Sequence, residues 1–375
     1  MLGIGKLGAG AEDYYLSAVA AGREDYYLRE GEAPGRWVGQ GARSFGLAGE
    51  VEAPELSAVL AGRDPGGGEQ LVRGPGGGRS RTPGFDLTFR APKSVSLVFA
   101  LGDEGSSTEA LASHERAVEA ALEYLEGHAA HLRRGAGGAE RVPALGLVGA
   151  AFVHRTSRAG DPALHTHVLV ANMAEDHEGR VGALDSRAIY RHAKTAGYLY
   201  QAELRHQLVE RLGVEWAPID NGVADIDGVP RQVIEAFSRR RQEIEARMAE
   251  RGDTSARAAQ AAALDTRATK DYGVSVERLE AEWRARAQEL GFGQREIEAC
   301  LYRAWEREPE IVEVERVFDE LSGPQGLTQN ESTFTRREVI RTLAERFGSV
   351  GASAVGELAD RFLESGRVVV LVPDR

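Results

Sequence analysis

The sequence predicts an α+β protein in which an antiparallel sheet is flanked by helices. Short runs of alternating β-branched and aromatic residues concentrate early in the 375-residue chain, and helical spacing dominates after residue 186. Two apolar runs, 142–153 and 164–173, are separated by the polar turn Arg155–Asp161, which is typical of an antiparallel hairpin. The length and the 42% apolar composition favour two or three domains with well-buried cores.

The amino-terminal region alternates short elements with breaks. Residues Met1–Leu7 predict a strand, and Ala11–Ala21 predict a helix that ends at Gly22. Two copies of Glu-Asp-Tyr-Tyr flank that break and contain four of the ten tyrosines of the chain. Residues 62–84 are rich in glycine and proline, a composition typical of a loop.

The next segments are predicted as a mixture of sheet and helix. Phe85–Leu101 alternates β-branched and aromatic residues around Ala91–Lys93, so we expect a strand pair or one bent strand. Thr108–Arg134 has apolar residues at helical spacing and predicts a long helix. Arg180–Leu184 follows a turn-like stretch and predicts a third strand after the hairpin.

The carboxyl-terminal half is predicted to be mainly helical, beginning with Ser186–Trp305. Thr335 and Glu338 form a capping-box pattern that opens a helix. A second helix is expected over Ser353–Glu364, and Val368–Val372 predicts a strand. This succession of helix, helix and strand predicts a small winged-helix-like segment.

Composition restricts the class of protein. Cys300 is the only cysteine, which excludes an intramolecular disulfide and fits a reducing compartment. The chain has no run of about 18 apolar residues and no signal-peptide pattern, so we expect a cytoplasmic location without membrane insertion. The net charge of -12 argues against a general nucleic-acid coat protein, although residues 63–93 hold six cations against three acids.

The strongest chemical signal is His154 followed by the pair His165 and His167. Residues two apart on a strand point to the same face, and a neighbouring strand that ends at His154 can supply a third imidazole. Three neutral imidazoles suit zinc, manganese, nickel or copper better than magnesium, which fits where substrate oxygens complete the shell. The alternative is a His-x-His pair that only decorates the surface. The remaining histidines are expected on helix surfaces or in loops: His114, His128, His131, His177, His192 and His206.

A cation held by neutral ligands favours an anionic substrate such as a phosphate, and a tyrosine is then a sensible nucleophile. A phenol titrates near pH ~10 and needs a base or a nearby cation before it attacks at neutral pH. Asp86, which opens its predicted strand, could be that base or could orient a metal-bound imidazole; a simple turn cap is the alternative. The paired tyrosines could also be core or base-stacking residues.

Several stretches together resemble the relaxase domain of the TrwC/TraI (MobF) class of conjugative DNA-transfer proteins. They are AEDYY and REDYYL near the amino terminus, GFDLTFRAPKSVSL at 84–97, and FVHRTSRAGDPALHTHVLVANM at 152–173. Residues 183–186, 194–200 and 264–270 resemble later parts of the same domain. The resemblance covers about residues 1–300, and it is specific because tyrosine pairs, an Asp-headed strand and three histidines occur in one order.

The resemblance implies a metal-dependent, site- and strand-specific DNA endonuclease that is also a strand transferase at a plasmid origin of transfer. In the family, a tyrosine of the first pair attacks the scissile phosphate and leaves a 5′-phosphotyrosyl link and a free 3′-hydroxyl. Carried over, Tyr14 is the first nucleophile with Tyr15 in reserve, and Tyr26 or Tyr27 makes the second transfer. The histidines would polarise the phosphate through the metal, and Asp86 would assist a tyrosine or a histidine. At least one of the other three tyrosines is still expected to pack or stack.

The family fold is an antiparallel, HUH-endonuclease-like palm in permuted order, with helical fingers that cover DNA. The resemblance implies a relaxase domain over 1–305, with the palm at about 1–215 and the fingers at about 229–290, then a winged-helix-like segment over 306–375. Expected partners are single-stranded and hairpin DNA of the origin, relaxosome accessory proteins and a type IV coupling protein. Basic residues expected to contact the DNA backbone are Lys93, Arg155, Arg158, Lys194, Arg267 and Lys270.

Large members of the class continue into a helicase, but the sequence has no G-x-x-x-x-G-K-[ST] pattern, so we expect no nucleotide site. The sequence is then either a short form or a fragment. A rolling-circle replication initiator would use the same chemistry, and a non-catalytic accessory protein would bind the origin without an adduct. From a different class, the histidines could belong to a cupin-like oxygenase in which the tyrosines are structural.

Overall fold

A computed structural model describes most of the chain. The described residues are 1–8, 35–74, 81–135, 138–252, 255, 258–259, 262, 276–306 and 313–371. Several predictions therefore lie outside the described residues: the helix Ala11–Ala21, the tyrosines Tyr14, Tyr15, Tyr26 and Tyr27, and the basic residues Arg267 and Lys270.

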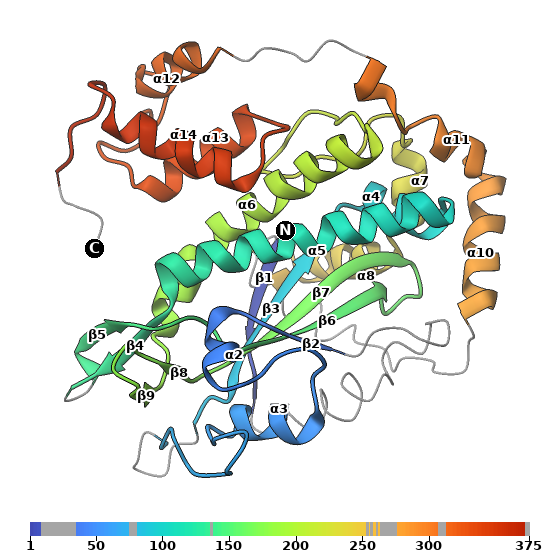
Figure 1. Cartoon of the computed structure of the whole chain (residues 1–375). Helices are drawn as coiled ribbons and strands as arrows, with labels where there is room; N and C mark the ends of the chain where they lie inside the picture. The colour runs from blue at the N-terminus through green and yellow to red at the C-terminus, as the bar shows by residue number, and fades with distance from the viewer. Residues whose placement is uncertain are drawn as a thin grey trace.

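The centre of the fold is a five-stranded antiparallel sheet in the order β1-β3-β7-β6-β2 (Figure 1). Its strands are β1 (Leu2–Lys6), β2 (Arg36–Val38), β3 (Gly84–Arg90), β6 (Gly149–Thr156) and β7 (Pro162–Ala171). The predicted α+β class, the amino-terminal strand and the antiparallel hairpin are confirmed.

Alternation along the strands divides the sheet into two faces. On one face, Phe85, Leu87 and Phe89 of β3 and Val168 and Val170 of β7 enter the main apolar core. Three helices cover this face: α4 (Lys93–Leu101), α5 (Glu104–Ala129) and α6 (Ser186–Leu212). Figure 1 shows α5 lying across the sheet with α6 beside it.

The opposite face of the sheet has two parts. Phe152 and Leu169 pack with α2 (Gln40–Ser44) and α3 (Ala53–Leu60) in a second apolar cluster. The three histidines of the sequence motif lie farther along β6 and β7 on this same face. The histidines therefore lie on the face opposite the long helices.

The prediction for Phe85–Leu101 is wrong in its second half. β3 ends at Arg90, and Lys93–Leu101 is the helix α4, with Pro92 as its N-cap residue. Nearly every residue of α4 is buried, so its sequence lacks the polar face that would reveal a helical period. A continuous run of β-branched and aromatic residues fits a strand and a buried helix equally well.

Two other boundaries differ from the prediction. The helix α5 stops before His131–Arg134, which is instead strand β4 and pairs with β5 (Glu140–Pro143). Ala130 leaves the helical conformation, with φ -78° and ψ 89°, and so ends α5. The predicted third strand is reduced to β9 (Val181–Gly182), which pairs with β8 (Ala174–Glu175) in a separate two-stranded sheet.

The second half of the chain is helical, as predicted. After α6 come α7 (Arg231–Ala236), α8 (Arg239–Arg251), α10 (Val276–Glu289), α11 (Gln294–Glu298), the 3-10 turn η3 (Arg303–Glu306), α12 (Val314–Ser322), α13 (Arg336–Arg346) and α14 (Ala352–Glu364). The capping box is confirmed, because the Thr335 amide and hydroxyl donate to Glu338 Oε2 at 2.7 and 2.9 Å. The strand predicted at Val368–Val372 is wrong for its described part: Val369 is 81% exposed, and no described strand pairs with it.

The carboxyl-terminal helices α13 and α14 pack against α6, on the helical side of the sheet (Figure 1). The fully buried Arg205 of α6 joins the two parts, since its guanidinium donates to the carbonyls of Ala344 and Gly348 at 2.7 Å each and to that of Gly222 at 2.9 Å. Within the described part of the chain, none of the helices has the length and apolar character needed to cross a bilayer.

Candidate metal centre

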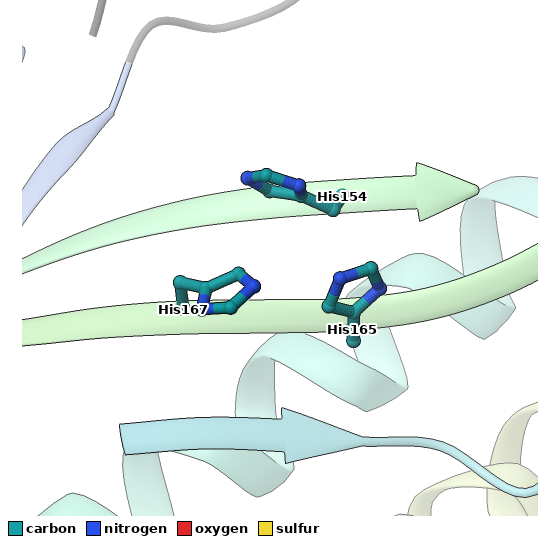
Figure 2. A group of neighbouring side chains, drawn as sticks. All are labelled: His154, His165 and His167. Carbon is teal, nitrogen blue, oxygen red and sulfur yellow. The ribbon is translucent and has the colours of Figure 1, made fainter. Parts of the chain in front are cut away.

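The three predicted histidines meet on adjacent strands. His154 on β6 lies directly opposite His165 on β7, and His167 is two residues farther along β7. One ligand nitrogen from each ring lies within 4.8 Å of the others, and the ring centroids are 4.9 to 5.2 Å apart. Figure 2 shows the three rings gathered on the same side of the two strands. Strand periodicity and the hairpin register therefore produce this cluster.

Hydrogen bonds fix the tautomers of two imidazoles. His165 Nδ1 is 2.7 Å from the carbonyl oxygen of Ala163, which can only accept, so Nδ1 carries the proton. His167 Nδ1 is 2.9 Å from both carboxylate oxygens of Asp86, which fixes the same tautomer. In both rings Nε2 then keeps its lone pair, as a metal ligand must.

Asp86 reaches His167 because the two residues lie on neighbouring strands. Its strand neighbour in the register is Leu169, two residues from His167 on the same face. The Thr88 hydroxyl donates to Asp86 Oδ1 at 3.1 Å and so helps to hold the carboxylate. Of the two roles considered for Asp86, the geometry supports the orientation of an imidazole.

The environment keeps His165 neutral. Burial lowers the pKa of His165 well below its usual value, and the neighbouring His154 and His167 lower this pKa further. His154 is only 4% exposed. A neutral imidazole is the form that binds a cation, so the chemistry of the donor set fits a divalent metal ion with His154, His165 and His167 as its ligands.

A network of buried hydrogen bonds holds β7 on the face of the sheet that the long helices cover. His114 of α5 has Nε2 2.8 Å from Thr166 Oγ1 and Nδ1 2.8 Å from the hydroxyl of Tyr200 on α6. Thr166 lies between His165 and His167 in sequence and points to the opposite face. His114 was expected at the surface, but it is completely buried, and burial lowers its pKa to about 3.

The turn between the two ligand-bearing strands is fixed by helices α8 and α10. Asp161, which is 1% exposed, accepts hydrogen bonds from the Arg239 amide and Nε at 2.9 and 2.8 Å and from Arg286 Nη1 at 2.9 Å. Trp283 Nε1 donates to the Gly160 carbonyl at 2.8 Å. Sequence reasoning placed Asp161 only at the end of a polar turn, because an aspartate in a turn is common without such partners.

The basic residues predicted to contact DNA lie in different places. Lys93 is half-buried and donates to the Pro162 carbonyl at 2.5 Å, and burial lowers its pKa to about 8. Arg155 has the strand parity opposite to His154, and its guanidinium lies 5.1 Å from the ring centroid of Phe99 in α4.

The other two described candidates are Arg158, half-buried in the β6–β7 turn, and Lys194, exposed on α6 with its ammonium 5.8 Å from the Tyr198 ring centroid. Arg155 and Arg158 both belong to the hairpin that carries the histidines, Arg155 in β6 and Arg158 in its turn.

The segment that contains the paired tyrosines is connected at both ends to the sheet. Before it, the Leu7 amide donates to the Gly84 carbonyl at 3.0 Å, two residues from Asp86. After it, Gly35 lies against Phe152, where an added Cβ would come within 2.2 Å of the ring. Phe152 is two residues from His154 on the same face of β6. One point of attachment is therefore two residues from Asp86 on β3, and the other is beside the residue of β6 two positions before His154.

Comparison with known proteins identifies the family. The model of the family described as TrwC relaxase matches residues 8–290 of the chain, which include the tyrosine pairs, Asp86 and the three histidines. The chain belongs to the TrwC relaxase family. The resemblance to the TrwC/TraI class is thereby confirmed, and a cupin-like oxygenase is excluded.

Curated relatives of this relaxase family include the multifunctional conjugation protein TraI of Escherichia coli, which is 38% identical over 270 residues. The same protein from strain K12 is 37% identical over 268 residues. Each match covers 68% of this chain and 14% of the relative, so the chain spans a small part of the length of these proteins.

Solved structures of TrwC have the same fold. A metal-free complex of TrwC with oriT DNA has a TM-score of 0.67 and 36% identity, and a copper-bound complex has a TM-score of 0.70 and 36% identity. A complex with a 27-mer that comprises the recognition hairpin and the cleavage site has a TM-score of 0.68 and 34% identity. Each covers 78% of this chain and 99 or 100% of the TrwC chain. The palm fold predicted from the motifs is therefore confirmed.

Proposed function

We propose that this relaxase-family chain nicks one DNA strand at a plasmid origin of transfer through a covalent tyrosine intermediate and later rejoins it by strand transfer. The observation that carries the proposal is the cluster of His154, His165 and His167 on a palm that matches DNA-bound TrwC. The tyrosine pairs of the matched region supply the nucleophiles that such chemistry needs.

The metal centre would be held by the Nε2 atoms of His165 and His167 together with His154. A divalent cation bound there would polarise a phosphate oxygen and stabilise the negative charge that develops on it. The carboxylate of Asp86 would keep His167 in the ligating tautomer throughout the reaction, because its hydrogen bond occupies Nδ1. TrwC structures described as metal-bound and copper-bound support a metal here and leave its identity open among magnesium, manganese, zinc, nickel and copper.

In the proposed step, the phenolic oxygen of Tyr14 attacks the scissile phosphorus and loses its proton to a base. The bond between phosphorus and the 3′ oxygen breaks, and that oxygen takes up a proton to become a free 3′-hydroxyl. One phosphodiester replaces another, so the step is reversible and needs no nucleotide. Tyr15 is the reserve nucleophile, and Tyr26 or Tyr27 would attack in the second transfer.

The proposed substrate is single-stranded DNA next to the origin hairpin, which is supported by the TrwC complex with a 27-mer that comprises the recognition hairpin and the cleavage site. Arg158, Arg267 and Lys270 are proposed backbone contacts, and Lys93, Arg155 and Lys194 would support the surrounding fold or contact DNA from other surfaces. Relaxosome accessory proteins and a type IV coupling protein are proposed partners of the conjugative process.

The test is adduct formation on a denaturing gel with a labelled single-stranded oligonucleotide that carries the cognate origin. We expect a labelled band at the mass of protein plus DNA that disappears with EDTA and in Tyr14→Phe. The control is Tyr190→Phe, which changes an exposed tyrosine of α6. Tight hairpin binding without any adduct in the parent would favour the non-catalytic accessory protein instead.

A further inference from the structure

Arg90 extends the row of histidines across a third strand. In the sheet register, Arg90 of β3 pairs with His165 of β7, which in turn pairs with His154 of β6. Arg90 also has the same strand parity as Asp86 and Thr88, which face His167. Directly paired residues on adjacent strands have Cβ atoms about 5 Å apart, so Arg90 is a next neighbour of the metal centre.

The guanidinium of Arg90 is available to a ligand. Arg90 is the exposed residue of β3, although the surrounding protein desolvates its guanidinium enough to lower its pKa. Among the described residues, no hydrogen bond or ion pair engages this guanidinium. Its Nη1 lies over Gly3 of β1, where an added Cβ would be only 3.1 Å away. At Gly5, the next residue of β1 on this face, no atom of the described residues lies within 4 Å of an added Cβ. Because Gly3 and Gly5 have no side chains, the described part of β1 leaves space for a ligand beside Arg90.

A guanidinium next to a divalent-cation site is electrostatically unfavourable unless an anion lies between them. The Asp86 carboxylate acts on Arg90 electrostatically and partly offsets the lowering of its pKa by burial, but the carboxylate oxygens are hydrogen-bonded to His167 and Thr88 and to no atom of the guanidinium. An arginine fork fits two oxygens of one phosphate and is more weakly hydrated than an ammonium, which suits a shared phosphate ligand. Without such a phosphate, the positive charge of Arg90 would repel the cation and weaken metal binding.

We propose that Arg90 binds the DNA backbone at the metal centre, either at the scissile phosphate or at the phosphate next to it, with the strand lying over Gly3 and Gly5. The proposal rests on the proposed function, since it assumes that the anion is a phosphodiester of single-stranded DNA. It makes Arg90 a substrate-binding residue that the sequence pattern alone does not distinguish from ordinary surface charge.

The test separates metal binding from DNA binding in Arg90→Gln and Arg90→Lys. Affinity for Mn²⁺ is measured by calorimetry without DNA, and affinity for a labelled oligothymidylate is measured by fluorescence anisotropy with Mn²⁺ over a series of salt concentrations. Arg116→Gln is the matched control, because Arg116 is an exposed arginine of α5 on the opposite side of the sheet.

We expect Arg90→Gln to bind the oligothymidylate about tenfold more weakly and to reduce the salt slope by about 0.7, the value of one neutralised phosphate on a single strand. The Mn²⁺ affinity of Arg90→Gln should be unchanged or about a few-fold higher, because the guanidinium that repels the metal ion has been removed. Arg90→Lys should keep the salt slope and lose part of the affinity, and Arg116→Gln should match the parent.

A parallel loss of Mn²⁺ and DNA affinity in Arg90→Gln would show a structural role and overturn the proposal. Unchanged DNA affinity and salt slope would overturn it as well, while the proposed nicking function would stand. If the parent binds neither Mn²⁺ nor the oligonucleotide, the proposed function itself fails, and the role of Arg90 fails with it.

Discussion

At the scale of single residues, Asp86 sets the tautomer of His167. Its carboxylate accepts from His167 Nδ1 at 2.9 Å and leaves Nε2 of that ring as the ligand atom. The negative charge also makes the imidazole a better electron donor. We expect Asp86→Asn to keep the fold and to weaken Mn²⁺ binding by roughly ten- to a hundredfold, measured by calorimetry.

The control for this prediction is Glu123→Gln, which removes one exposed carboxylate from α5. Equal Mn²⁺ affinity in Asp86→Asn and the parent would show that the hydrogen bond to His167 does not tune the centre.

Some of these residues could be predicted from the sequence and others could not. The histidine cluster follows from a period of two and a short hairpin, so its geometry is encoded locally. The roles of Asp161 and Arg90 depend on partners far away in sequence, such as Arg286 for Asp161 and His165 for Arg90. A turn aspartate and a strand-end arginine have no local signature that distinguishes them from ordinary surface charges.

At the scale of elements, the β6–β7 turn links the metal centre to α8 and α10. Asp161 is buried and binds Arg239 and Arg286, so Asp161→Ala would remove the carboxylate that both arginines share and leave Arg286 with Glu282 alone. We expect a loss of about 3 kcal/mol in the free energy of unfolding by urea. Amide hydrogen exchange should rise in α8 and α10 and stay slow in α5.

Asp360→Ala is the matched control for Asp161→Ala. Asp360 forms a similar two-bond pair with Arg336, but its side chain is 54% exposed, so we expect a loss below about 1 kcal/mol. A loss as small as this in Asp161→Ala would mean that the turn does not depend on its carboxylate.

The helix α4 shows why element type could not always be predicted. Its residues are buried against the sheet and α5, so neither polar alternation nor a polar stripe marks it. The exposed Val369–Leu371 is the converse case, in which high β-propensity occurs without a described strand to pair with. In both segments the secondary structure is determined by tertiary packing and not by local propensity.

At the scale of the whole molecule, Arg205 couples the sheet-bearing part of the chain to the carboxyl-terminal helices. Its guanidinium donates to carbonyls of Gly222, Ala344 and Gly348, and all three would lose their donor in Arg205→Met. We expect a loss of roughly 3 kcal/mol in unfolding free energy and faster amide exchange in α13 and α14. Arg187→Met, at a side chain 69% exposed, should behave like the parent; equal exchange in both variants would argue against the coupling.

Global stability should also depend on the protonation of His114. Burial lowers the pKa of His114 to about 3 in the folded protein, whereas its usual value is 6.5. The unfolded chain therefore takes up a proton first as the pH falls, so this contribution to stability is complete above pH 6.5 and is lost between 6.5 and about 3. The loss is at most about 5 kcal/mol.

The measurement is urea unfolding at pH 7 and at pH 5 for the parent, His114→Gln and the control His177→Gln, whose side chain is exposed in a loop. His114→Gln should be less stable than the parent at pH 7 and should lose less stability on acidification. The same pH dependence in all three proteins would exclude His114 as the cause.

The family membership, the sheet and the three facing imidazoles together lead to one central claim, that a tyrosine of the 9–34 segment becomes covalently attached to a DNA phosphate at this centre. Peptide mass spectrometry after incubation with Mn²⁺ and the cognate single-stranded origin tests this claim most directly. We expect a nucleotide attached to Tyr14 in the parent and none in His154→Ala. Cleaved DNA with a free 5′-phosphate, and no nucleotide on any tyrosine of that segment, would contradict it.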